Sequence, residues 1–293
     1  MSVAAVATAK ESLMGNQSIT KFAAQLIRPS PICAFVPYNR RHDMKPRILR
    51  YESVPSTNTE VARFAAEGAA EGLAIVADEQ TAGRGRLQRA WSSTKGAGLY
   101  FSILLRPKLA PDRWPLITFV AALATGDALL DASEVQTDIK WPNDLLANER
   151  KICGILAEAI ETPTGRAVVL GIGINLTNDA FPPDLLNVAT SVANESGGQP
   201  ERERILAALL NALARWYSLL HEPDGAAKIV AAWSSRSSYA SGKLVQVTNG
   251  DEVLQGLTRG IENDGALRLE TAQGIQLIRA GDVTRVRPAR VNA

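Results

Sequence analysis

"RKICGILAEAI" (residues 150–160) and "RAVVLGIGINL" (residues 166–176) are the stretches that decide the fold expected for this chain. Both are short apolar runs rich in Ile, Leu and Val, which is typical of buried strands. Together with "VQTDIKW" (135–141) and "DLLA" (144–147), they give several strands separated by brief turns. A second half so rich in strands favours a mixed or mostly antiparallel sheet with helices, an α/β (α+β) fold, over a doubly wound parallel sheet.

Periodicity predicts further elements on both sides of this region. Residues 114–132 are apolar throughout, which indicates a buried helix, and residues 201–220 place apolar side chains on one helical face. The other expected elements are strands at 47–54, 73–80 and 99–107, a helix within 55–72, and a shorter helix up to about Trp233.

The character of the sequence changes near Ser238. From Lys243 onward, short alternating strands are separated by Asn-Gly, Asn-Asp-Gly and Gln-Gly turns. This pattern predicts a small β-barrel of roughly fifty residues. We therefore divide the chain into an N-terminal extension (1–45), a main domain (46–237) and a C-terminal domain (238–293).

The charge distribution argues against a nucleic-acid partner. The chain has 293 residues and a formal net charge of +2. Residues 1–45 contain six basic and two acidic residues, so this segment carries +4 and the remainder carries −2. A mildly acidic body is not suited to neutralising many phosphates, so we expect no DNA binding.

Cysteine usage and hydropathy predict a cytoplasmic protein. Cys33 lies in the expected extension and Cys153 in an apolar run, so a reducing compartment fits better than a disulfide framework. No apolar stretch approaches the ~18 residues of a membrane span, and no signal-peptide core is present, so we expect no membrane association. For residues 1–45 a disordered extension, or an over-long start with Met44 as the true beginning, is preferred to a transit peptide.

The stretch "GRGRLQRAW" (83–91) combines glycines with Arg84, Arg86 and Arg89. Glycine lets backbone amides approach a ligand, and arginine offers forked donors that match phosphate or carboxylate. Composition alone leaves two interpretations open: a solvated basic loop, or a cradle for a small anion that orders it.

Two motifs contribute lysines. "KWPND" (140–144) places Lys140 beside an Asn-Asp turn at a strand end, which suits either an anionic substrate and its metal or an ordinary turn. "KICGILAE" (151–158) offers Lys151 and an interior Gly154, which indicates either a close ligand approach or a core strand with a surface lysine.

"GIGINL" (171–176) is not a dinucleotide fingerprint, because it lacks the third glycine and opens no helix. Its glycines can admit a flat ring against the backbone, and Asn175 can then accept a hydrogen bond from an amine on that ring. Cys153 is not expected to be a nucleophile, because His42 lies in the extension and His221 at a helix end. We interpret Cys153 as a small core residue.

Six motifs together resemble those of the biotin–protein ligases. No single motif is specific, but their order and spacing match that family from about Arg47 to Arg287. The resemblance implies a catalytic core like that of class II aminoacyl-tRNA synthetases, followed by an SH3-like barrel. The motifs are "STN" (56–58), "DEQTAGRGRLQRAW" (78–91), "KWPND", "KICGILAE", "GIGINL" and "RGIENDGAL" (259–267).

That family activates biotin with ATP and Mg²⁺ to biotinyl-5′-AMP, releases pyrophosphate, and transfers biotin to a lysine of an acceptor protein. The resemblance therefore implies a biotin–[acetyl-CoA-carboxylase] ligase of the monofunctional type, acting on a biotin carboxyl carrier protein domain. It also implies a monomer or a homodimer, with residues 46–237 as the biotin- and ATP-binding catalytic domain.

The resemblance assigns roles residue by residue, and it assigns no metal ligand. The implied catalytic residues are Lys151, Lys140 and Arg86. The implied biotin-binding residues are Ser56, Thr57, Asn58, Gln80, Arg84, Gly85, Arg86 and Lys151. The implied ATP-binding residues are Arg86, Arg89, Trp91, Lys140, Asn143, Asn175 and Arg259.

One position departs from the family pattern, which reads GRGRxGRxW. Here Gln88 replaces the inner glycine, so we expect a stiffer loop that still functions. If the backbone there has a positive φ, Gln88 costs about 1 kcal/mol relative to glycine.

Three alternatives remain beside a monofunctional biotin ligase. A ligase that doubles as a DNA-binding repressor is not expected, because the 45 residues before the core are proline-rich and lack helical periodicity. A lipoate or octanoate ligase is the nearest enzymatic alternative, and the 80–91 loop with KWPND favours biotin over it. A non-catalytic biotin-binding protein is disfavoured by Lys140, Lys151, Arg86 and Arg89.

Overall fold

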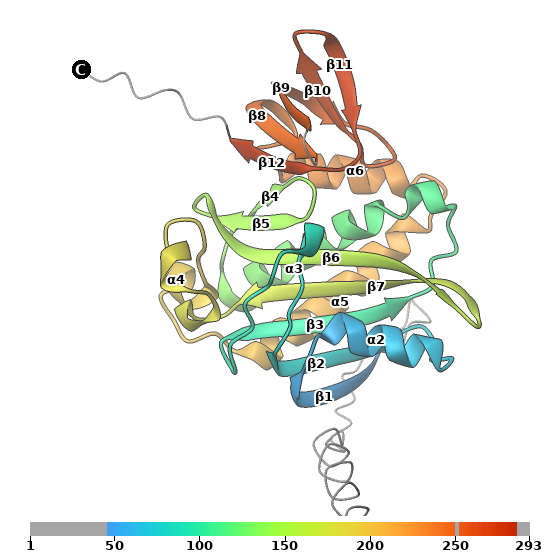
Figure 1. The fold of residues 1–293 in the computed structure, drawn as a ribbon, viewed down its shortest axis with the longest axis vertical. Coiled ribbons are helices and arrows are strands. Elements are labelled where there is room, and N and C mark those ends of the chain that lie inside the picture. Colours follow the sequence, from blue (N-terminus) through green and yellow to red (C-terminus); the bar gives the residue numbers. More distant parts are fainter. Residues whose placement is uncertain (1–45, 250–251, 286–293) are drawn as a thin grey trace, which may run out of the picture.

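The computed structural model describes residues 46–249 and 252–285, so the predictions for the N-terminal extension lie outside the described residues. Two sheets organise the chain (Figure 1). The larger has seven strands in the order β1-β2-β3-β7-β6-β5-β4, and the smaller has five strands in the order β11-β10-β9-β8-β12.

The larger sheet is mixed, as predicted. Strands β1 and β2 pair in parallel, joined by a crossover through a helix, and the other neighbours pair antiparallel. In sheet order the strands are β1 (Arg47–Val54), β2 (Leu73–Gln80), β3 (Gly98–Leu105), β7 (Gly165–Asn175), β6 (Arg150–Thr162), β5 (Asp144–Ala147) and β4 (Asp138–Lys140).

Helices cover both faces of this sheet, which explains why its central strands are apolar throughout. The helix α2 (Thr57–Ala66) lies on one face, and α3 (Leu116–Ser133) and α5 (Arg202–Leu220) lie on the other (Figure 1). The remaining helices are α4 (Val192–Ser196), beyond the end of β7, and α6 (Gly225–Ser235), beneath the smaller sheet.

Helix α3 departs from the hydropathy expectation. Residues Pro111–Ser133 are long and apolar enough to cross a membrane, although 61% of the most apolar window is buried inside the protein. The helix packs against the sheet and against α5, and a helix that is apolar on all sides is typical of a protein core.

Side chains alternate between the two faces of the sheet, and this alternation positions the site. On β7, Val168 and Leu170 join the core beneath α3, whereas Ala167 and Val169 join the smaller core beneath α2. The same alternation places Gly171, Gly173 and Asn175 on the α2 face, beyond the helix itself. On the α2 face, the last residues of β7 therefore present a surface with few side chains, in a region that α2 does not cover.

The C-terminal sheet shares the main hydrophobic core. Buried residues of its strands, such as Val245 and Leu267, belong to the same cluster as Phe119 of α3 and Trp233 of α6. The Trp141 indole donates a hydrogen bond to the Gly265 carbonyl, 3.0 Å away, across the junction. The strands are β8 (Ser241–Asn249), β9 (Glu252–Ile261), β10 (Leu267–Thr271), β11 (Gly274–Ile278) and β12 (Asp282–Arg285).

Removing the Phe119 ring is expected to lower the free energy of unfolding by about 3–5 kcal/mol, because a buried aromatic side chain leaves a cavity. Phe119 stacks on Trp233 with ring centroids 4.6 Å apart, and this contact joins α3 to α6. Urea denaturation of Phe119→Ala measures the loss. Leu130→Ala, on the exposed side of the same helix, is the control and should change stability by less than about 0.5 kcal/mol. Equal losses would contradict the assigned core.

Candidate active site

A cavity that is open to solvent lies on the α2 face of the sheet, with about 470 Å³ of empty space that includes its open mouth. Strands β2, β3, β6 and β7, the start of α2 and the arginine loop (residues 81–97) line it. The structure brings ten of the predicted residues to this cavity: Ser56, Thr57, Asn58, Gln80, Arg84, Gly85, Arg86, Trp91, Asn143 and Lys151.

Glycines form the floor of the cavity, and each makes room for a named side chain. A Cβ added at Gly171 would lie 2.2 Å from Oδ1 of Asn58. A Cβ at Gly173 would lie 2.7 Å from the Trp91 indole, and one at Gly154 would lie 2.8 Å from the same ring. Gly173 and Gly154 therefore leave room for a flat ring, and in this structure that ring is the indole of Trp91, a residue of the arginine loop.

A buried polar network forms the wall at the start of α2. The Gln80 side-chain oxygen accepts the backbone N–H of Thr57 at 2.8 Å, so Gln80 satisfies one of the N–H groups that lack a partner within the first turn of this helix. The Ser102 hydroxyl lies 2.7 Å from the Thr57 hydroxyl and donates to Oδ1 of Asn58 at 2.6 Å. Sequence reasoning missed Ser102, although a serine inside the apolar strand "LYFSILL" is a detectable exception.

Glu158 links this wall to the arginine loop. Its carboxylate accepts hydrogen bonds from Nδ2 of Asn58 at 2.7 Å and from Arg84 at 3.1 Å. Because the carboxylate can only accept, it fixes the orientation of the Asn58 amide. Glu158 lies inside the KICGILAE motif, but no pattern in the sequence indicates its contacts with Asn58 or Arg84.

The arginine loop folds into a tight hairpin. Gly85 donates its backbone N–H to Arg89 at 2.7 Å, and Trp91 donates its own to Gly83 at 2.9 Å. At the tip, Gln88 has φ +59°, so the condition for strain at this position is fulfilled. The neighbouring Leu87 has φ +53°.

Arg86 and Arg89 contact the C-terminal sheet. Arg86 donates to Oδ1 of Asn143 at 3.2 Å and to the carbonyl of Gly281 at 3.3 Å, and it lies 3.8 Å from the Asp282 carboxylate. Arg89 forms an ion pair with Asp282. Burial lowers the pKa of the Arg86 guanidinium, and the nearby carboxylates oppose this effect. No local sequence pattern predicts Asp282, because its contacts arise only when the C-terminal sheet packs beside the loop.

Two lysines face Asp144. The Lys151 ammonium lies 2.6 Å from Oδ1 of Asp144 and 5.2 Å above the Trp91 ring. Lys140 is paired with Asp144 in the β4–β5 register. Burial lowers the pKa of Lys140, and the charge of Asp144 opposes this effect.

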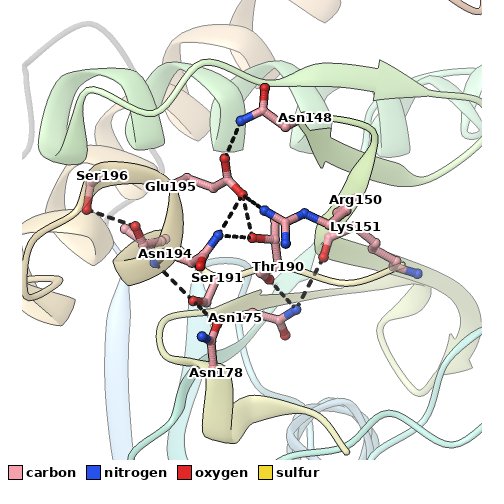
Figure 2. Close-up of polar contacts among 11 residues, drawn as sticks. Asn148, Arg150, Lys151, Asn175, Asn178, Thr190, Ser191, Asn194, Glu195 and Ser196 are labelled. Carbon is pink, nitrogen blue, oxygen red and sulfur yellow. Dashed lines mark hydrogen bonds and ion pairs between the residues drawn. The ribbon is translucent and has the colours of Figure 1, made fainter. Parts of the chain in front are cut away.

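Asn175 is not among the residues that line the cavity, and Figure 2 shows its amide directed at Thr190 and Lys151. Its amide nitrogen donates to the carbonyl of Thr190 at 3.0 Å and lies 3.4 Å from the carbonyl of Lys151. Because both partners are carbonyl oxygens, the amide orientation is fixed and its own oxygen remains an acceptor.

Arg259 and Cys153 lie apart from this chemistry. Arg259 is paired with Glu270 on the neighbouring strand and does not line the cavity. Its predicted contact with the nucleotide therefore gains no support from the geometry. Cys153 is fully buried, and burial raises the pKa of its thiol, in agreement with a core role.

Comparison with known proteins identifies the class. Residues 51–175 match the biotin/lipoate A/B protein ligase family, and residues 240–285 match the biotin protein ligase C terminal domain. The second match coincides with the C-terminal sheet. The chain therefore belongs to the biotin/lipoate A/B protein ligase family.

Relatives specify the kind of ligase. A biotin–[acetyl-CoA-carboxylase] ligase of Paracoccus denitrificans is 36% identical, covering 78% of this chain and 96% of its own. A bifunctional ligase/repressor of Bacillus spizizenii is 35% identical, covering 82% and 74%. The biotin protein ligase of Aquifex aeolicus in complex with biotin and ATP superposes with a TM-score of 0.71 at 29% identity, covering 82% and 99%.

These findings confirm the predicted fold and the predicted family. The protein is a biotin protein ligase, with biotin and ATP as its substrates. Its relatives include proteins named biotin–[acetyl-CoA-carboxylase] ligase and proteins named bifunctional ligase/repressor, so membership alone does not distinguish the two types.

Replacing Gly173 by alanine is expected to lower kcat/KM for biotin adenylation at least tenfold. The added methyl group would lie 2.7 Å from the Trp91 indole, so the ring must move out of its place on the strand. Pyrophosphate release with saturating biotin measures the effect. Gly198→Ala is the matched control, because its methyl group would lie 3.9 Å from the Ser196 hydroxyl and far from crowding. Unchanged activity in Gly173→Ala would show that Trp91 does not depend on the glycine floor.

Proposed function

We propose that this cavity binds biotin at the polar wall and ATP at the cationic end, and that it joins them as biotinyl-5′-AMP. The observation that carries the proposal is the convergence of Arg86, Arg89, Lys140 and Lys151 near Asp144 and Asp282, next to a polar pocket. Bringing one anion, a carboxylate, to another, a triphosphate, requires such preorganised positive charge.

The first step needs no general base. The biotin carboxylate is ionised at neutral pH, and one of its oxygens attacks the α-phosphorus of ATP. The bond from that phosphorus to the bridging oxygen breaks, and pyrophosphate leaves with both electrons. Among the cations, we assign Arg86 and Lys151 to the carboxylate and the α-phosphate, and Arg89 and Lys140 to the other phosphates.

The polar wall suits the head group of biotin. Ser56, Thr57, Asn58 and Gln80 present hydroxyl and amide groups held by one another and by Ser102. A ureido ring needs both donors and acceptors, and this wall supplies both kinds. Arg84 and Gly85 of the arginine loop cover the same end of the cavity.

Trp91, Asn143 and Asn175 are assigned to the nucleotide. Trp91 offers a flat ring on the glycine floor, and its indole nitrogen has no hydrogen-bond partner among the described residues. Asn143 bridges the carbonyl of Ile155 and the Arg86 guanidinium, so it also positions that arginine. Asn175 lies outside the cavity lining with its amide nitrogen held by Thr190, and we assign its oxygen to the exocyclic amine of adenine.

Magnesium fits the site through Asp144. Within residues 46–249 and 252–285 no group of three or more His, Cys, Asp or Glu could hold a metal. Mg²⁺ bound through substrate phosphates needs only one or two carboxylates. The buried Oδ1 of Asp144 is already 2.6 Å from the Lys151 ammonium, so a bound Mg²⁺ would share this carboxylate with Lys151. When bound, the ion supplies positive charge to the phosphates.

In the second step, we propose that a lysine of a biotin carboxyl carrier domain attacks the carbonyl carbon of the adenylate. The bond from this carbon to the phosphate oxygen breaks, AMP leaves, and the lysine nitrogen loses a proton. The relative from Paracoccus denitrificans bears the name of an acetyl-CoA-carboxylase ligase, which supports this acceptor.

Four sequence-based predictions are kept as proposals. We infer a catalytic domain at 46–237 and a C-terminal domain from 238, supported by the division of the strands between two sheets. We also infer a cytoplasmic enzyme, supported by the free, buried Cys153. A monofunctional ligase without DNA binding is supported by the −2 charge of residues 46–293. Finally, we infer that the enzyme is a monomer or a homodimer.

Replacing Lys151 by alanine is expected to lower the rate of adenylation 10²- to 10³-fold, the usual effect of losing one preorganised donor to transition-state charge. Exchange of labelled pyrophosphate into ATP, dependent on biotin, measures the first step alone. Lys95→Ala is the matched control, because that side chain is 65% exposed and 4.0 Å from Glu52. Exchange supported by lipoate instead of biotin would overturn the substrate assignment, and normal exchange in Lys151→Ala would overturn the role of Lys151.

Biotin with ATP is expected to protect the arginine loop from trypsin, which cleaves after Arg84, Arg86 and Arg89. Gln88→Gly should slow cleavage without ligand about fivefold, because glycine removes about 1 kcal/mol of strain from the hairpin. Gln88→Ala is the control that deletes the side chain and keeps the strain. Equal cleavage rates with and without ligand would contradict a closing loop, and equal rates for the two variants would contradict strain at Gln88.

A further inference from the structure

A buried carboxylate lies behind Lys151, away from the cavity. The side chain of Glu195, at the start of α4, is only 6% exposed. Figure 2 shows that the surrounding polar groups converge on it. It accepts hydrogen bonds from Asn148 at 2.6 Å, Arg150 at 2.8 Å, Thr190 at 2.5 Å and Asn194 at 3.2 Å. None of these residues contacts the cavity.

These donors come from separate segments of the chain. Asn148 lies in the β5–β6 turn, where its φ is +49°, and Arg150 opens β6. Thr190 lies in the irregular segment before α4. Glu195 therefore fastens that segment to the beginning of β6, directly beside Lys151.

The fastened segment holds both backbone groups of Lys151. The N–H of Lys151 donates to the carbonyl of Val188 at 2.8 Å, and its carbonyl accepts the N–H of Thr190 at 2.9 Å. The carbonyl of Thr190 in turn accepts the amide of Asn175. The positions of Lys151 and Asn175 are thus set by residues 188–190, and those residues are anchored by Glu195.

The charge state of Glu195 suits this role. Burial works against its ionisation, but hydrogen bonds from Thr190, Asn148 and Asn194 and the charge of Arg150 outweigh burial and hold the pKa of the carboxyl below its ordinary value. The side chain is therefore an acceptor only, and each of its four neighbours donates to it.

We propose that Glu195 is a positioning residue for the nucleotide: through Thr190 it fixes the amide of Asn175 with its oxygen toward the amine of adenine, and it fixes the backbone of Lys151. The inference rests on the proposed roles of Lys151 and Asn175. It goes beyond them because it predicts that a residue outside the cavity controls the choice between a 6-amino and a 6-oxo purine.

The physical reason lies in the donors and acceptors. Adenine offers an amine that an amide oxygen can accept, whereas hypoxanthine offers a carbonyl oxygen that needs a donor. Glu195→Gln places an NH₂ group among existing donors, so the anchor must rearrange and the amide of Asn175 is no longer held in one orientation. A freed amide can turn its nitrogen toward a 6-oxo group.

The test compares ATP with inosine triphosphate in the full enzyme, by biotin-dependent pyrophosphate release. Glu195→Gln is expected to raise KM for ATP at least tenfold, to leave KM for biotin unchanged, and to reduce the preference for ATP over inosine triphosphate at least fivefold. Thr190→Val, which removes the hydroxyl and keeps the carbonyl, should move the preference in the same direction by less. Glu161→Gln is the matched control, since this carboxylate of β6 is 77% exposed and pairs with Arg166.

The outcomes separate this inference from the proposed function. If Asn175→Ala leaves the purine preference unchanged, the proposed role of Asn175 is wrong. If Asn175→Ala changes the preference and neither Glu195→Gln nor Thr190→Val does, only the positioning role is wrong. A double variant of Glu195 and Asn175 should behave as Asn175→Ala alone, whereas additive effects would contradict action through Asn175.

Discussion

Strand β7 presents two unlike faces, and the site depends on the difference. Its even-numbered residues Val168 to Ile174 are packed in the core beneath α3, which fixes the register of the strand. The opposite face carries glycine at 171 and 173, so Asn58 and Trp91 approach the backbone closely. A side chain at either glycine would displace one wall of the cavity. The alternation of core side chains on one face of β7 with glycines on the other face therefore sets both the packing of the sheet and the shape of the site.

The positive charges of the site are paired with negative charges of the protein. The cations assigned to the substrates are paired with carboxylates of the protein, Lys151 with Asp144 and Arg89 with Asp282. Partly buried arginines and lysines would repel one another and lose hydration without such partners. In the proposed mechanism, the substrate phosphates therefore meet arginines that are already oriented. The phosphates must then share these arginines with Asp282 or replace Asp282 as their partner. Because Asp282 belongs to β12, the C-terminal sheet takes part in this exchange.

Local patterns predicted much of this molecule. Strands β1 and β2 have the expected bounds, because periodicity is recorded in neighbouring residues. Ten residues that line the cavity were predicted from the resemblance of their motifs to a known family, and not from periodicity. Ser102, Glu158 and Asp282 were missed, because Asn58, Arg84 and Arg89, their respective partners, lie 44, 74 and 193 positions away and no local pattern records such pairs. For Arg259 the motif suggested a contact with the nucleotide, which stays a prediction, and in the structure the residue pairs with Glu270.

The arginine loop shows how these separate features act together. Leu87 and Gln88 both have positive φ, which costs about 1 kcal/mol for each non-glycine residue. The hairpin persists because Arg84 is bound to Glu158 and Arg89 to Asp282, and because Trp91 covers the bare face of β7. Arg84 and Arg89 are 43% and 69% exposed, so each of these ion pairs contributes only about 0–1 kcal/mol. The strain at the tip is thus offset by contacts on three sides, and a ligand that binds Arg86 and Arg89 changes the partners of an ordered loop.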